Sequence, residues 1–117
     1  MDQAKLDNLA RGGIQAADAL ERFMGSDALL ERFLKRFLED ATYSSLYQAV
    51  EAGDWQQALT ASHTLKGMCG NLSMTELYDL FTRQVALLRE DKPADAAALM
   101  PAIEAAYRRA ADAIGQL

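Results

Sequence analysis

The chain has 117 residues, 50% of them hydrophobic and 25% charged, which is an ordinary balance for a single globular domain spanning 1–117. Its net charge of −5 argues against a nucleic-acid binder, which needs a basic face. The single cysteine allows no internal disulfide, no apolar run is long enough to span a membrane, and the N-terminus lacks the pattern of a secretory signal, so we expect a cytoplasmic protein without membrane contact.

The predicted secondary structure is helical, because alanine, leucine and glutamate dominate and no alternating strand pattern is present. A first helical stretch ends at Gly12-Gly13. The other predicted helices span about 14–24, 27–40, 42–52, 55 to 69 or 72, 74–90 and 94–115. Amphipathic helices joined by short turns predict an all-α fold, an antiparallel up-down four-helix bundle with an additional N-terminal helix.

Short polar residues, glycine and proline mark several of the helix ends. Gly53-Asp54 supplies a stop followed by a cap. Ser73, with Glu76 three residues later, predicts a capping box at the start of the next helix. Pro101 interrupts the last helical stretch, so the final helix is expected to begin there, with proline in its first turn.

The helix predicted over 27–40 has an apolar face that is wider than packing on one neighbour requires. Its apolar side chains are Leu29, Leu30, Phe33, Leu34, Phe37 and Leu38, followed by Ala41. Some of them could contact a partner, and we expect this of Leu38. The alternative is that they cover the N-terminal helix or the alanine-rich C-terminal stretch, which we favour for Phe33.

His63 is the only histidine of the chain. At about 100° per residue, the apolar stripe of its helix falls on the opposite side. That stripe consists of Ala58, Ala61, Leu65, Met68 and Leu72. His63 is therefore expected to face solvent, and its face also carries Gln56, Lys66, Gly67 and Gly70.

The two glycines on this face need an explanation. A glycine inside a helix costs on the order of 1 kcal/mol relative to alanine, and on an exposed face it gains no packing. Gly67 and Gly70 remove side-chain bulk beside the imidazole, which lets a second protein approach His63 closely. Lys66, at i+3, can place an ammonium beside an anion on the ring, such as a phosphoryl group. The alternatives are a solvated histidine without a role and a Gly70 that only caps the helix.

Two other kinds of site are disfavoured around His63. A metal site lacks a second histidine, and Cys69 lies well round the helix. A Ser-His or Cys-His nucleophile pair is disfavoured because Ser62 and Thr64 point about 100° away from His63. We therefore expect no metal and no cofactor in this chain.

The string His63-Thr64-Leu65-Lys66-Gly67, followed by Gly70-Asn71-Leu72, resembles the signature of histidine-containing phosphotransfer (HPt) domains, and Ala52-Gly53-Asp54-Trp55 resembles the family's entry into its active helix. HPt domains carry phosphoryl groups between receiver domains in two-component phosphorelays. The resemblance implies that His63 accepts the phosphoryl group through Nε2, that Lys66 offsets its charge, and that Gly67 and Gly70 provide clearance. It also implies a partner, the receiver domain of a response regulator or of a hybrid histidine kinase, whose acidic pocket holds a magnesium ion.

Further residues are candidates for supporting roles. Some HPt domains use a glutamine on the next helix to orient the imidazole, and the resemblance suggests Gln84 for this role. The alternative is an internal hydrogen bond, because Gln84 lies near the centre of the apolar stripe of its own helix. Leu59 is an apolar residue at about −40° from His63, so we expect it to contact the partner, together with Gln56 and Leu38.

Nothing in the sequence resembles a nucleotide site, so we expect a phosphoryl carrier rather than an enzyme. Two alternatives stay open: a helical adaptor or regulator that binds a response regulator without transfer, and the HPt portion of a larger hybrid or chemotaxis-type kinase. The starting methionine and compact length favour a stand-alone chain. We expect a monomer, although five methionines and one broad apolar helix leave dimerisation open.

Overall fold

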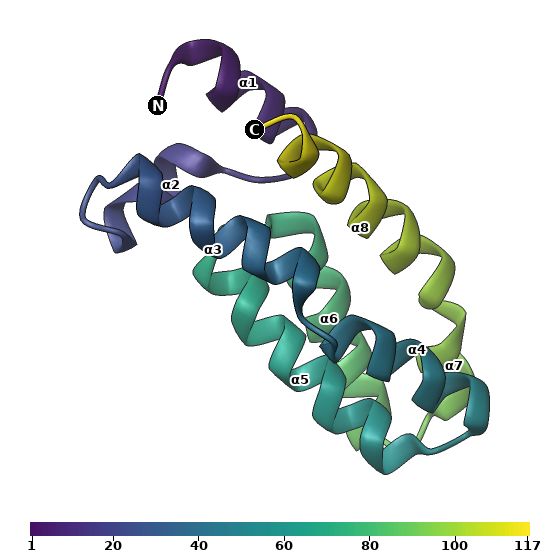
Figure 1. Cartoon of the computed structure of the whole chain (residues 1–117). Helices are drawn as coiled ribbons and strands as arrows, with labels where there is room; N and C mark the ends of the chain where they lie inside the picture. Colours follow the sequence, from purple (N-terminus) through teal and green to yellow (C-terminus); the bar gives the residue numbers. More distant parts are fainter.

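The computed structural model describes all 117 residues, and most of them are helical (Figure 1). The helices are α1 (Gln3–Arg11), α2 (Ala16–Arg22), α3 (Asp27–Glu39), α4 (Thr42–Ala52), α5 (Trp55–Asn71), α6 (Thr75–Arg89), α7 (Pro93–Ala98) and α8 (Met100–Gly115). There is no strand, and one isolated antiparallel bridge joins Ile14 to Met74. The predicted all-α class is confirmed.

The helices form four rods that run alternately up and down (Figure 1). α3 and α4 follow each other along one rod, α5 and α6 form an antiparallel hairpin, and α7 leads into α8. α1 and α2 lie at the end of the bundle where α5 turns into α6 and where α8 ends. The predicted up-down four-helix bundle is confirmed, with two short N-terminal helices in place of one. None of the helices combines the length and apolar character that a membrane span requires.

Local signals begin and end helices at several predicted places. Gly53 ends α4 in the left-handed conformation, with φ of 70°. The Asp54 carboxylate caps α5 by accepting a hydrogen bond of 3.2 Å from the amide of Gln57. Pro101 lies in the first turn of α8, and the break from α7 falls at Leu99. The predicted starts of α5 and α8 are therefore correct to within one residue.

The predicted capping box at the start of α6 is wrong. Ser73 has a left-handed backbone, with φ of 54°, and the N-cap residue is Met74, which makes no side-chain cap bond. The Ser73 hydroxyl donates instead to the Asp18 carboxylate at 2.6 Å, and Glu76 pairs with Arg109 of α8. A carboxylate is a strong acceptor, so packing of α2 against this turn overrides the local signal.

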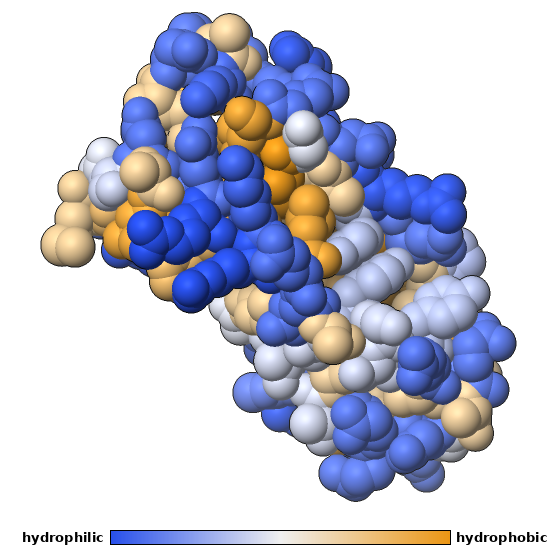
Figure 2. All heavy atoms as spheres, in the orientation of Figure 1, coloured by the Kyte–Doolittle hydropathy of each residue, from blue (hydrophilic) through white to orange (hydrophobic).

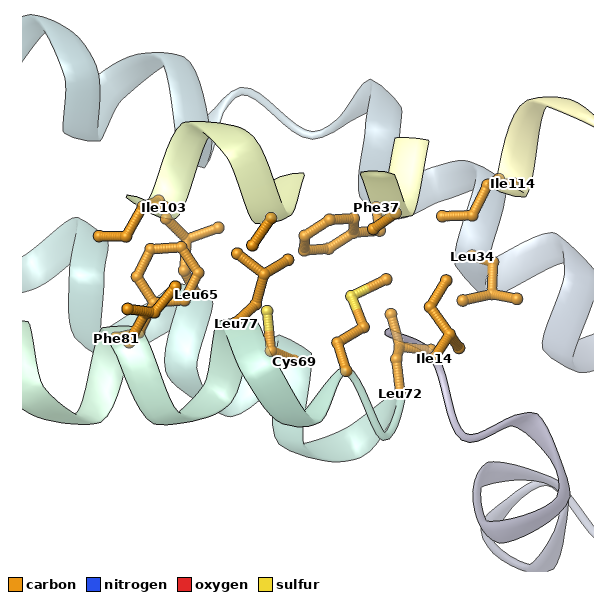
Figure 3. Packing of buried hydrophobic residues seen from close by; sticks show 14 of the residues in the cluster. Ile14, Leu34, Phe37, Leu65, Cys69, Leu72, Leu77, Phe81, Ile103 and Ile114 are labelled. Atoms are coloured by element: carbon orange, nitrogen blue, oxygen red, sulfur yellow. The ribbon is translucent and has the colours of Figure 1, made fainter. Parts of the chain in front are cut away.

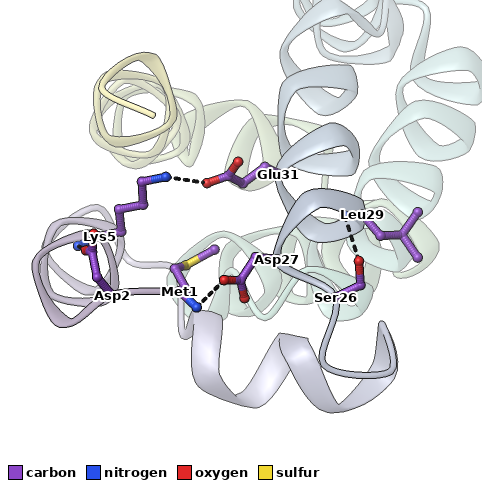
Figure 4. Close-up of polar contacts among 7 residues, drawn as sticks. All are labelled: Met1, Asp2, Lys5, Ser26, Asp27, Leu29 and Glu31. Carbon is purple, nitrogen blue, oxygen red and sulfur yellow. Dashed lines mark hydrogen bonds and ion pairs between the residues drawn. The ribbon is translucent and has the colours of Figure 1, made fainter.

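Charged groups hold α1 near the start of α3 (Figure 4). Lys5 Nζ lies 3.0 Å from Glu31 Oε1, and the N-terminal amine pairs with Asp27. In the same region, Ser26 Oγ caps α3 by accepting a hydrogen bond of 3.2 Å from the amide of Leu29. Ion pairs at exposed positions contribute little individually, so α1 also depends on its packing.

That packing is against the end of α8. Asn8 Nδ2 donates to the carbonyl of Ala113 at 3.0 Å, and Leu9 is fully buried. Gly12 permits this approach, since a Cβ built on it would lie 2.5 Å from the Cβ of Ala113. Gly12 is therefore required by the closeness of two helices and not by its backbone angle.

The hydrophobic core runs along the bundle between α3, α5, α6 and α8 (Figure 3). Leu65, Phe81 and Ile103 meet towards one end, and Ile14 and Leu34 lie towards the other. The segment after α1 thus contributes to the same core as the four rods. Hydrophilic residues cover most of the surface shown in Figure 2, and hydrophobic residues reach that surface between α3 and α8.

Gly12→Ala should lower the free energy of unfolding by about 1–3 kcal/mol, because the added methyl overlaps Ala113 and overpacking has costs of this size. Urea denaturation would measure it. Gly115→Ala is a matched control on α8, since a Cβ there meets no atom within 4 Å, and its stability should be unchanged or slightly raised. Equal stability of Gly12→Ala and the wild type would show that α1 does not pack on α8 as described.

Candidate functional site

His63 lies near the middle of α5 with its side chain exposed to solvent. The buried residues of α5 are Ala58, Ala61, Ser62, Leu65 and Cys69. The predicted outward orientation of His63 is confirmed. The predicted apolar stripe differs at one position, because Cys69 is buried and Met68, which is predicted to be buried, is half-buried. The side-chain hydrogen bonds of α5 belong to Thr60, Ser62 and Thr64, which leaves the imidazole free for a group presented by another molecule.

Lys66 and Gly67 lie one turn farther along α5. Lys66 is half-buried, and none of the ion pairs of the chain involves its ammonium. A Cβ built on Gly67 meets no atom within 4 Å, so the surface over this residue is open. Residues at i and i+3 on a helix are neighbours, with about 5–6 Å between their Cβ atoms. An imidazole, an unpaired cation and bare backbone can together accommodate an anion bound to the ring.

Gly70 has a different environment from the one predicted. A Cβ built on it would lie 3.1 Å from two ring carbons of Tyr78 on α6. Gly70 therefore makes room for an aromatic ring of the same chain, and the expectation that it leaves open space for a partner is wrong. It also lies inside α5, which ends one residue later at Asn71, so it is not a helix cap.

Gln84 does not contact the imidazole. It is fully buried, its Oε1 accepts a hydrogen bond of 2.8 Å from the Ser62 hydroxyl, and its Nε2 donates to the carbonyl of Ala96 at 3.1 Å. Nε2 also lies 3.2 Å from the sulfur of Met100. Both ends of the amide are thus occupied inside the bundle, which corrects the suggested orienting role and matches the alternative of an internal hydrogen bond. The sequence shows that Gln84 needs a partner but not that the partner is Ser62.

The three residues expected to contact a partner occupy different positions. Gln56 is exposed on α5, and Leu59 is half-buried outside the main hydrophobic cluster, so both remain accessible near His63. Leu38 packs against the core. It lies seven residues after Glu31, on the side of α3 that pairs with α1, so its position gives no support to the expected contact with a partner.

Phe33, which is expected to cover the N-terminal helix or the alanine-rich C-terminal stretch, packs against Phe23 at the end of α2 and is still 37% exposed. Its ring lies 5.2 Å, centroid to centroid, from that of Phe23, and the Arg36 guanidinium lies 5.7 Å from the Phe33 centroid. Phe33 is thus an aromatic side chain that reaches the surface on the side of α3 facing away from Leu38.

Cys69 is not a competing nucleophile. Burial raises the pKa of its thiol to about 12, so the reactive thiolate is disfavoured near neutral pH. The thiol lies within the core, close to Leu77 in Figure 3. No group of three or more His, Cys, Asp or Glu side chains is arranged to hold a metal ion. The exposed reactive group of α5 is therefore the imidazole.

Comparison with protein families gives one match: residues 28–113 match the family described as the Hpt domain. The chain belongs to the Hpt domain family. The match covers α3 to α7 and most of α8, and it leaves α1 and α2 outside. No curated protein and no solved structure matches the chain. Hpt domains are phosphocarriers in histidine phosphotransfer and interact with receiver domains of response regulators, so this chain has a general role in phosphorelay signalling.

Within this Hpt domain, Gln84→Leu should lower the free energy of unfolding by about 1–3 kcal/mol, because it leaves the buried Ser62 hydroxyl without its partner and removes one of the two hydrogen bonds to the Ala96 carbonyl. Denaturation by urea would measure the loss. Phosphoryl transfer to the folded variant, measured well below its unfolding midpoint, should proceed at the wild-type rate. A slow transfer at unchanged stability would restore the imidazole-orienting role of Gln84.

Proposed function

We propose that this Hpt domain carries a phosphoryl group on His63 between the aspartates of receiver domains in a two-component phosphorelay. The observation that supports this most directly is the exposure of the only imidazole on the face of α5 opposite the core, beside the unpaired Lys66. The open surface over Gly67 supports it as well, because a transfer between two proteins needs close approach of their backbones.

In the proposed step, the lone pair of His63 Nε2 attacks the phosphorus of an aspartyl phosphate. The N–P bond forms as the P–O bond to the aspartate breaks, and the carboxylate leaves with the electron pair. Nδ1 keeps its proton, and the Lys66 ammonium offsets the charge of the phosphoryl group on the ring. The reverse step delivers the group to the aspartate of another receiver, and this proposal assigns the magnesium ion to the receiver's carboxylates.

His63→Gln should abolish phosphoryl labelling while the fold is retained. The His63 side chain is exposed, so its replacement removes no contact from the core. The experiment incubates the chain with phosphorylated receiver domains from the same genome and follows acid-labile label. Circular dichroism and urea denaturation check the fold. Labelling of His63→Gln at the wild-type level would disprove the role of His63, and loss of cooperative unfolding would show that His63 is structural.

A second variant tests whether labelling needs the surroundings of His63 or only an exposed histidine. His63→Gln combined with Gln48→His moves the imidazole to an exposed position on α4, away from Lys66 and Gly67. We expect no labelling of this variant by a receiver. If the wild type binds a receiver but takes no label from it, the chain is an adaptor that acts by binding alone.

Gly67→Gln should slow receiver-dependent transfer by about tenfold, because a long side chain on the open surface holds the two proteins apart and small displacements of reacting groups are costly. Helix content should be intact. Gly67→Ala is the milder control, and it should raise the free energy of unfolding by about 0.5–1 kcal/mol with a smaller effect on transfer. Unchanged transfer by Gly67→Gln would contradict the clearance argument.

A further inference from the structure

The exposed face of α5 that carries His63 has two flanks, one beside α6 and the other beside α4 and, along the second half of α5, beside α3. On the α6 flank, the ring of Tyr78 packs against α5, and the neighbouring hollow is lined by Asp18, Arg22 and Asp79 among others. Arg22 is paired with Asp18, which leaves the carboxylate of Asp79 without a cation. This flank is therefore filled by an aromatic ring and has no free positive charge in its hollow.

On the other flank, a hollow of about 290 Å³ separates α3 from the second half of α5. It is lined by Phe33, Arg36, Phe37, Asp40, Met68, Asn71 and Leu72. Met68 and Asn71 lie about 7 and 12 Å along α5 from His63. Around the helix axis, Gly67 lies about 40° from His63, Asn71 about 80° and Met68 about 140°, so Gly67 lies between His63 and the two residues of the hollow. Bare backbone thus connects the imidazole to the hollow.

The charges around this hollow are available to a partner. The guanidinium of Arg36 lies over the ring of Phe33. It does not pair with Asp40, whose carboxylate accepts a hydrogen bond of 2.8 Å from the amide of Thr42. Hydrogen bonding by the side chain of Thr42, and then by its amide, lowers the pKa of Asp40. Glu39 is the only exposed carboxylate within α3. The exposed cations of α3 without an ion pair are Arg32, Lys35 and Arg36.

We propose that a receiver domain docks on the α3 flank, with an apolar side chain of the receiver in the hollow against Phe33 and Met68 and a receiver carboxylate paired with Arg36. The inference rests on the proposed function, because a protein surface that holds a magnesium ion beside its phosphorylated aspartate is rich in carboxylates. The charges of α3 complement such a surface, although the whole chain carries a net charge of −5. A standard interface buries about 800 Å² on each partner, which is wide enough to cover both His63 and the hollow.

Two pairs of variants test this choice of flank. Phe33→Ala and Tyr78→Ala remove aromatic side chains of similar exposure, 37% and 38%, from the α3 and α6 flanks. Arg36→Glu and Arg83→Glu reverse exposed charges on α3 and α6. The probe is the receiver domain from the same genome that binds the wild type most tightly, in its unphosphorylated form with magnesium. Calorimetry measures the Kd, and a urea transition confirms that each variant is folded.

Phe33→Ala and Arg36→Glu should each raise the Kd about tenfold or more, with the effect of Arg36→Glu shrinking at high salt. Tyr78→Ala and Arg83→Glu should change the Kd less than about twofold. The opposite pattern would place docking on the α6 flank and overturn the inference. The inference would also be overturned if none of the four variants changed the Kd, or if the wild type bound no receiver.

A small-molecule phosphoryl donor such as phosphoramidate separates this inference from the role of His63. It needs no docking surface, so Phe33→Ala and Arg36→Glu should be labelled by it at the wild-type rate. Label from phosphoramidate on the wild type together with unaltered receiver binding by these variants would refute the docking site alone. Receiver binding that depends on Phe33 and Arg36, without label on His63 from any donor, would refute the carrier role alone.

Discussion

Burial of the apolar stripe of α5 determines how this helix is rotated about its axis, and the buried hydrogen bond between Ser62 and Gln84 reinforces that rotation. Ser62 directly precedes His63, and its hydroxyl has one partner, the Gln84 amide, whose other end is bound to the Ala96 carbonyl. A rotation of α5 by one residue would leave two buried polar groups unpaired, each at a cost of about 1–3 kcal/mol. The bond that joins α5 to α6 and α7 therefore adds to the apolar packing that turns His63 outward, without any contact to the imidazole.

The two glycines near His63 lie on the same face of α5, but packing within the chain explains only one of them. Tyr78 requires a glycine at position 70, because a Cβ there would lie 3.1 Å from two carbons of the Tyr78 ring. A Cβ on Gly67 would meet no atom within 4 Å, so packing within the chain does not exclude alanine at this position. Alanine would favour the helix by about 1 kcal/mol relative to glycine. The proposed function supplies a reason outside the chain, which is the close approach of a second protein to His63.

Much of the fold follows from local information in the sequence. The ends of α4 and α5 are set by Gly53 and Asp54, and the outward direction of His63 follows from helical periodicity. Most of the errors concern side chains whose partners come from another helix. The position of Ser73 near Asp18 illustrates this, because the local pattern of a capping box is present but a carboxylate 55 residues away in the sequence binds the hydroxyl.

The candidate site divides in the same way. Periodicity predicts that Lys66 and Gly67 share the face of His63, but it places Leu38 and Phe33 within one wide apolar face of α3 and cannot rank them. Which of the two is exposed depends on where α1 and α5 lie against α3. The ion pair of Glu31 with Lys5 puts α1 on the side of Leu38, and Phe33 is left to border the hollow beside α5.

The N-terminal helices, which lie outside the matched residues 28–113, bear on the site through the turn between α5 and α6. Arg22 Nε donates to the carbonyl of Asn71 at 3.0 Å, and the amide of Gln15 donates to the carbonyl of Ser73 at 2.9 Å. Ser73 has a positive φ, a conformation that is unfavourable for a residue other than glycine. These bonds therefore hold a strained turn in place. Since Asn71 also lines the hollow beside α3, α2 fixes one wall of the proposed docking surface from a part of the chain that the family match does not include.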